Sequence, residues 1–259
     1  MILHWSFDPV LVSLGSLSVR WYGLLFVGAF LAGEWILGRL FVRDGVARDA
    51  AEKLLYLGLF GTVIGARLVH CLFYDPDYYL AHPVAILKIW EGGLASHGGV
   101  MGMLLALVWG WKLAGWPRPF LWLLDRVTLP AALGAVFVRV ANFLNSEILG
   151  NPTDGSWGVV FERVDALPRH PVQLYEAVGY LLTLLVLWAL YRRRRADAPD
   201  GLLFGVMMVL VFGVRIAAEF FKTPQAAYEA GQLFTVGQYL SLPFVALGLV
   251  FVVRALRRA

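Results

Sequence analysis

Charged side chains are scarce in this sequence of 259 residues, in which Asp, Glu, Lys and Arg together make up 15% and hydrophobic residues 59%. The mean hydropathy is +0.69. In soluble globular domains about a quarter of the residues are charged. The shortage of charge therefore excludes an ordinary soluble domain and indicates that lipid is the main solvent of the chain.

Cysteine is almost absent, since Cys71 is the one cysteine in the sequence. A single thiol excludes a disulfide framework and a thiolate metal cluster, and we expect neither a metal nor another cofactor. Cys71 stands near the end of an apolar run, where a lone cysteine is usually a small buried hydrophobe. A nucleophilic role is the alternative.

Long apolar runs fill most of the chain. Many reach about 18 residues, enough to cross a hydrocarbon core of about 30 Å, and they lack the alternation of barrel strands. No signal peptide is expected before the first run, because Asp8-Pro9 interrupts residues 1–20. The sequence predicts an all-α, polytopic integral membrane protein, with residues 1–259 forming a single domain. Its approximate spans are 21–40, 54–74, 94–114, 127–143, 173–191, 202–221 and 236–253.

Basic residues follow alternate spans and predict the orientation. They are Arg39, Arg43, Arg48 and Lys53, then Lys112, Arg118 and Arg126, then Arg192 to Arg195, and finally Arg254, Arg257 and Arg258. The positive-inside rule places the amino terminus outside and the carboxyl terminus in the cytoplasm. The net charge of +4 thus reflects orientation, and no nucleic acid is expected as a partner.

Residues 144–170 form a polar stretch between the fourth and fifth spans, on the external side in this topology. Asn151-Pro152-Thr153-Asp154-Gly155 is a strong turn signal, and Trp157 to Phe161 has the composition of a short strand. We expect a small folded element outside the membrane. A second external loop is expected from Lys222 to Phe234.

Several charged side chains lie inside the predicted spans, where each costs several kcal/mol unless it has a partner or a function. Within the spans they are Glu34, Arg67, His97, Arg139, Arg215 and Glu219, and Glu147 and Glu176 stand near span ends. The predicted topology brings most of them into the outer half of the membrane. A cluster in one leaflet indicates a site that acts on a ligand there.

Two segments concentrate these polar groups. Arg139 and Asn142 share a helix face, and Asn145 and Glu147 follow where the helix is expected to end. Arg215 and Glu219 lie one helical turn apart and can pair with each other, so pairing and catalysis both remain open for them.

His97 precedes Gly98-Gly99, which would allow a ligand to approach the backbone beside an imidazole. A lone histidine in a span is more often a structural residue than a base, and the nearby glycines and the arginines of the same leaflet favour the base. Guanidinium groups bind phosphate through paired hydrogen bonds. We therefore predict a phospholipid headgroup as the ligand.

Several motifs in order give the chain a family resemblance. They are Arg20-Trp21-Tyr22-Gly23, Gly65-Ala66-Arg67, the segment from Trp90 to Gly99, the segment from Arg139 to Glu147, Arg169 to Glu176, and Arg215 to Phe221. Together they resemble the bacterial prolipoprotein diacylglyceryl transferases along nearly the whole length. One departure is Val211, where some family members have a tyrosine one turn before the arginine.

The resemblance implies a transfer reaction in the bacterial cytoplasmic membrane, with the site facing outward. The diacylglyceryl group of phosphatidylglycerol passes to the thiol of the lipobox cysteine of a prolipoprotein, forming a thioether, and glycerol phosphate leaves. The expected partners are phosphatidylglycerol, the prolipoprotein signal peptide and membrane lipids. This would be the first step of lipoprotein maturation.

The predicted catalytic residues follow from this reaction. Arg139 and Arg215 would stabilise the leaving phosphate, and His97 is the candidate base for the thiol. The other predicted substrate-binding residues are Tyr22, Arg67, Gly98, Gly99, Asn142, Asn145, Glu147 and Glu219. Gln173, Tyr175 and Glu176 are expected to support them.

Two other functions fit charged groups inside spans. A transporter of an anionic substrate would need polar groups through the depth of the membrane and often shows repeated halves, which are not evident here. A noncatalytic phospholipid-binding homologue would keep the arginines but tolerate the loss of His97.

Overall fold

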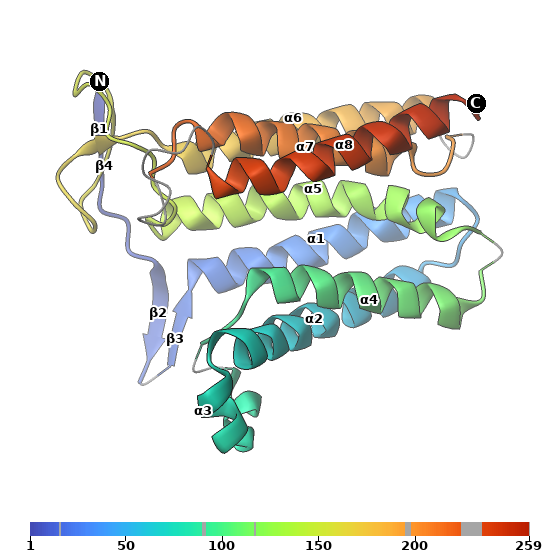
Figure 1. The fold of residues 1–259 in the computed structure, drawn as a ribbon, viewed down its shortest axis with the longest axis horizontal. Coiled ribbons are helices and arrows are strands. Elements are labelled where there is room, and N and C mark those ends of the chain that lie inside the picture. Colours follow the sequence, from blue (N-terminus) through green and yellow to red (C-terminus); the bar gives the residue numbers. More distant parts are fainter. Residues whose placement is uncertain (16, 90–91, 117, 195–197, 224–234, 259) are drawn as a thin grey trace. The chain divides into compact units, whose positions relative to one another are not determined.

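A computed structural model describes residues 1–15, 17–89, 92–116, 118–194, 198–223 and 235–258 (Figure 1). The chain forms two compact units, one of residues 1–36 and 124–259 and the other of residues 37–123. Trp90 and Glu91 of the family motif lie outside the described residues. So do Arg195 and positions 224–234 of the second predicted loop.

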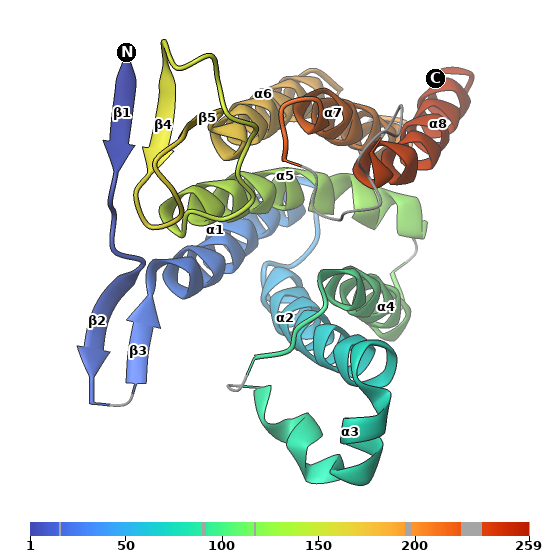
Figure 2. The ribbon, with the colours of Figure 1, turned by 60° about the vertical axis from the view of Figure 1, so that its left-hand side comes forward.

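Long helices make up most of the first unit. They are the first part of α1 (Trp21–Arg43), most of α5 (Phe120–Leu144), α6 (Val172–Arg194), α7 (Leu202–Glu219) and α8 (Val236–Leu256). Helix α7 packs against both α6 and α8, as Figures 1 and 2 show. At the start of α5, the buried carboxylate of Asp125 accepts hydrogen bonds from the backbone N–H groups of Gly201 (2.7 Å) and Phe204 (2.8 Å). Asp125 thereby satisfies N–H groups that a helix start leaves unpaired, and it fixes the beginning of α7.

The second unit contains a close pair of helices. It consists of α2 (Asp49–Val69), the π-helical turn η1 (His70–Tyr74), α3 (Pro76–Ala81), the 3-10 turn η2 (Pro83–Leu87) and α4 (Ser96–Ala114), besides the end of α1. Helices α2 and α4 pack together (Figure 2). A Cβ atom on Gly65 would press on the carbonyl oxygen of Gly98 and lie 2.8 Å from Cα of Gly102. Small residues four apart therefore allow this contact, as they do in many membrane helices.

Two small sheets accompany the helices of the first unit. Strands β1 (Ile2–Trp5), β4 (Gly158–Phe161) and β5 (Pro168–Arg169) form one sheet, and β2 (Val10–Leu14) and β3 (Leu17–Arg20) form a hairpin. Strand β1 runs parallel to β4, with Ile2 opposite Gly158. Phe161 is fully buried and packs with Phe143, Val159 and Trp5. The strand expected near 157–161 is confirmed, whereas its pairing with the amino-terminal segment was not predicted.

The predominantly helical, polytopic fold is confirmed. Each predicted span corresponds to a helix, and within the described residues six helices are long and apolar enough to cross a membrane. Helix α4 is not one of the six, because its glycines, His97 and Lys112 lower its hydropathy. The orientation of the helices stays a prediction.

Candidate functional site

The end of α5 carries a chain of hydrogen bonds. Nη1 of Arg139 donates to the side-chain oxygen of Asn142 (3.3 Å), and Nδ2 of Asn142 donates to Oε2 of Glu147 (3.1 Å). Nδ2 of Asn145 donates to the other oxygen, Oε1, of Glu147 (3.1 Å). The structure thus brings together four of the predicted site residues, as their spacing indicated.

The backbone after α5 turns sharply and is strained. Ser146 and Ile148 both have positive φ angles, 56° and 54°. This region is unfavourable for a β-branched residue, and such strain is typical of functional sites. The carbonyl of Glu147 accepts a hydrogen bond of 2.6 Å from Nε2 of Gln173 at the start of α6. Gln173 is buried and fixes the turn that carries Glu147, and its role in supporting the binding of substrate stays a prediction.

Glu176 of α6 joins two cations in the interior. Its side chain has no exposed surface, and its Oε2 lies 3.1 Å from Nε of Arg139. Its Oε1 lies 3.3 Å from Nζ of Lys222. A buried carboxylate needs such partners, because an unpaired charge in the interior costs several kcal/mol. Glu176 therefore fixes the position of Arg139.

Lys222, three residues beyond the end of α7, was expected only as the first residue of the second external loop. Its side chain is 5% exposed, and its Nζ lies 2.9 Å from Oε2 of Glu219. The Glu219 carboxylate also lies against Gly237 at the start of α8, where a Cβ atom would come within 2.6 Å of Oε1. The signal for Lys222 was its spacing, since residues three apart on a helical turn can pair.

Arg215 is half-buried on α7. Among the described residues, none forms a hydrogen bond or an ion pair with its guanidinium, in contrast to the pairing with Glu219 that the spacing allows. A Cβ atom on Gly179 of α6 would come within 2.5 Å of the side chain of Val214, so the residue before Arg215 packs against α6. Arg215 therefore belongs to the turn of α7 that contacts the part of α6 carrying Glu176.

Arg67 belongs to the second unit, where it is 3% exposed. Its guanidinium donates hydrogen bonds to the backbone carbonyls of residues 85, 86, 88, 92 and 93. It also lies 5.0 Å from the ring centre of Tyr79. These contacts connect α2 to the segment that leads into α4. The binding of substrate by Arg67 stays a prediction.

His97 and its glycines also lie in the second unit, in the first turn of α4. His97 is exposed, whereas Gly98 and Gly99 are buried. A Cβ atom on Gly98 would meet Cβ of Val69 at 2.5 Å, and one on Gly99 would meet Thr62 at 3.3 Å. Both glycines therefore pack against α2, and their predicted contact with substrate is untested.

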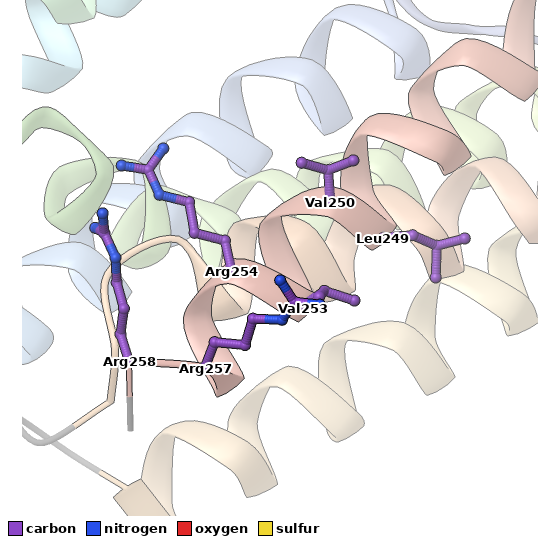
Figure 3. Close-up of a pocket in the computed structure, with 6 residues that line it drawn as sticks. All are labelled: Leu249, Val250, Val253, Arg254, Arg257 and Arg258. Carbon is purple, nitrogen blue, oxygen red and sulfur yellow. The ribbon is translucent and has the colours of Figure 1, made fainter.

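A separate groove lies at the carboxyl-terminal end of α8 (Figure 3). It contains none of the predicted site residues, since it is lined by Leu249, Val250, Val253, Arg254, Arg257 and Arg258. Within the described part of the chain, no group of three or more His, Cys, Asp or Glu side chains is placed to hold a metal ion.

Comparison with known proteins decides the family. The sequence model described as prolipoprotein diacylglyceryl transferase matches residues 9–254. The chain belongs to this family. A phosphatidylglycerol–prolipoprotein diacylglyceryl transferase of Tolumonas auensis is 54% identical over 249 residues, 96% of each chain. The protein of the same name from Chloroherpeton thalassium is 46% identical over 99% of this chain and 96% of its own length.

Proposed function

We propose that the chain transfers the diacylglyceryl group of phosphatidylglycerol to the thiol of a lipobox cysteine in a prolipoprotein. The observation that supports this most directly is a pair of arginines beside α6: Arg139 is fixed by Glu176 of that helix, and Arg215 lies on α7, which packs against it, and has no partner among the described residues. Both cations suit a phosphodiester, and the related proteins carry the names of this transferase.

In the proposed reaction, the cysteine sulfur attacks the terminal carbon of the diacylglycerol part, to which the phosphate is bonded through oxygen. The new carbon–sulfur bond forms as the carbon–oxygen bond breaks, and the bonding electrons leave with glycerol phosphate. Arg139 and Arg215 stabilise the charge that develops on the phosphate oxygen. His97 takes the thiol proton, because the thiolate is the better nucleophile.

The remaining predicted residues hold the substrate. Asn142, Asn145 and Glu147 form a polar surface beside Arg139, and Tyr22 would add a hydroxyl group to the binding of the substrate. These groups would bind the glycerol hydroxyls of the headgroup. Arg67 would act from the second unit, and Gly98 and Gly99 would let the substrate approach close to His97.

The arrangement of charges favours this function over a transport path. Arg139 and Arg215 lie late in α5 and α7, and Glu176 lies early in α6. Residues 129–138 of α5 and 205–214 of α7 contain no charged side chain. A path for an anion would need polar groups along this depth. We further propose that the cluster faces the outside of the bacterial inner membrane, as the positive-inside rule predicts.

Incubating the purified protein with phosphatidylglycerol and a lipobox peptide tests the function. The expected result is a mass increase of one diacylglyceryl group on the peptide cysteine. Arg139→Gln should lower kcat about 100-fold or more, because it removes a donor to the developing charge. Arg163→Gln is the matched control, since its side chain is 48% exposed and pairs with Asp8 at the surface.

Two outcomes would contradict parts of the proposal. Unmodified peptide after incubation with the wild-type protein would refute the transferase function and leave a noncatalytic lipid-binding role. Undiminished modification by His97→Gln would remove the histidine from the base role while leaving the transfer itself intact.

A further inference from the structure

The carboxylate of Glu219 has two possible cationic partners. Arg215 lies four residues earlier on α7, a spacing that normally allows an ion pair. Glu219 instead pairs with Lys222 at 2.9 Å, and the described residues offer the Arg215 guanidinium no carboxylate of its own. The spacing thus allows Glu219 two cationic partners, and the structure shows it paired with Lys222.

The backbone around Lys222 is fixed by the segment that follows the Glu147 turn. Lys222 forms an antiparallel bridge with Gly150, and the N–H of Asn151 donates to the carbonyl of Phe221 (2.7 Å). Oγ1 of Thr223 donates to the carbonyl of Gly150 (2.9 Å). A side chain at Gly150 would collide with the carbonyl of His170, so only glycine allows this close approach. These contacts hold the lysine near its acceptors before any ligand binds.

One of the three cations in the cluster has no carboxylate partner among the described residues. Arg139, Arg215 and Lys222 carry positive charges, and the carboxylates of Glu176 and Glu219 oppose them. The carboxylate of Glu147 is more exposed than those of Glu176 and Glu219, and it accepts hydrogen bonds from the side chains of two asparagines. The cation without such a partner is Arg215. A phosphodiester carries one negative charge and would pair with it.

We propose that Lys222 is a positioning residue that keeps Arg215 unpaired by binding the carboxylates of Glu219 and Glu176. The anion that Arg215 then receives is the phosphate of an anionic phospholipid, an identity that rests on the function proposed above. Lys222 acts through the glutamates and does not itself touch the lipid.

Lys222→Ala tests the competition between the two cations. Without the ammonium, the Glu219 carboxylate is expected to turn to Arg215 and neutralise it. The affinity for phosphatidylglycerol should fall about 10-fold or more, the value of one charged hydrogen bond. The readouts are titration with phosphatidylglycerol in phosphatidylcholine nanodiscs and the KM for this lipid in the transfer assay.

The double variant Glu219→Gln/Lys222→Ala separates this role from a purely structural one. It removes the carboxylate that would otherwise turn to Arg215, so it should bind phosphatidylglycerol several-fold more tightly than Lys222→Ala does, a gain of the order of one charged hydrogen bond. Lys222→Arg keeps the charge and should bind the lipid nearly as the wild type does. Lys222→Met preserves the apolar stem, and thermal unfolding of every variant checks the fold.

The competition is refuted if Lys222→Ala and Lys222→Met bind the lipid as tightly as the wild type does. It is also refuted if the double variant binds no better than the single variant. The binding assay does not depend on catalysis. If the variants differ in lipid binding as expected but the wild-type protein transfers nothing, the role of Lys222 is supported and the transferase function is refuted.

Discussion

Replacing Glu176 with glutamine removes the negative charge that Arg139 and Lys222 share. The side chain of Glu176 is fully buried, and its oxygens lie 3.1 Å from Nε of Arg139 and 3.3 Å from Nζ of Lys222. Removing one partner of a buried ion pair typically costs about 3–5 kcal/mol. Glutamine has nearly the same shape and keeps one acceptor oxygen, so the expected loss is near the lower end, about 3 kcal/mol.

Thermal unfolding of the detergent-solubilised protein measures this loss. With a shift of about 2–4 °C per kcal/mol for chains of similar size, Glu176→Gln should lower Tm by roughly 6–12 °C. Glu162→Gln is the matched control. Its carboxylate lies 3.0 Å from His4 but is 45% exposed, and exposed pairs contribute about 0–1 kcal/mol.

A Tm for Glu176→Gln no lower than that of the Glu162→Gln control would refute the reasoning. It would mean that Arg139 and Lys222 do not depend on the charge of Glu176. The same variant should also lower kcat, because Arg139 loses the group that holds it in place.

Three further changes test other parts of the structure. Arg67→Lys should speed hydrogen exchange in residues 85–89, because an ammonium cannot bond the same set of carbonyls as a guanidinium. Gly65→Val should weaken the α2–α4 contact and lower Tm, whereas Gly134→Ala should not, because a Cβ atom at Gly134 meets nothing within 4 Å. Hydrogen bonds from Arg169 lower the pKa of Asp165 from its model-peptide value of 3.8. The stabilisation is therefore complete above pH 3.8 and is lost as the pH falls through the lower pKa of the folded state. Hydrogen exchange around β5 should show this loss, and Asp165→Asn should remove the pH dependence.

The helices could be predicted from the sequence because length and hydropathy determine which segments enter lipid. The clearest difference is at α5, expected from residue 127 but beginning at Phe120. Asp125 and Arg126 resembled a charged boundary, yet both are buried, and Asp125 holds the start of α7 through contacts with residues far along the chain. Because the acceptors of Asp125 find their donors about 76 to 79 residues later in the chain, no pattern in the neighbouring sequence predicts that this charge is buried.

The same distinction applies to the candidate site. The contacts among Arg139, Asn142 and Glu147 join residues within one turn and its continuation, so local spacing was enough to predict that these residues lie close together. The pair of Glu176 with Lys222 joins residues 46 positions apart, and it appears only when α6 and the end of α7 are packed. Local spacing allows Glu219 to pair with either Arg215 or Lys222, and only the folded structure shows that it pairs with Lys222.

The parallel pairing of β1 with β4 determines when this sheet can form during synthesis of the chain. Strand β1 is made first, but its partner follows only after α1, α2, α4 and α5. At about 5–20 residues per second, the ribosome needs on the order of 10–30 s to produce the intervening chain. During that time the N–H and C=O groups of β1 have no strand beside them, which is a state prone to wrong pairing. Closure of this sheet is therefore a late event that can occur only after the first four long helices have been synthesised.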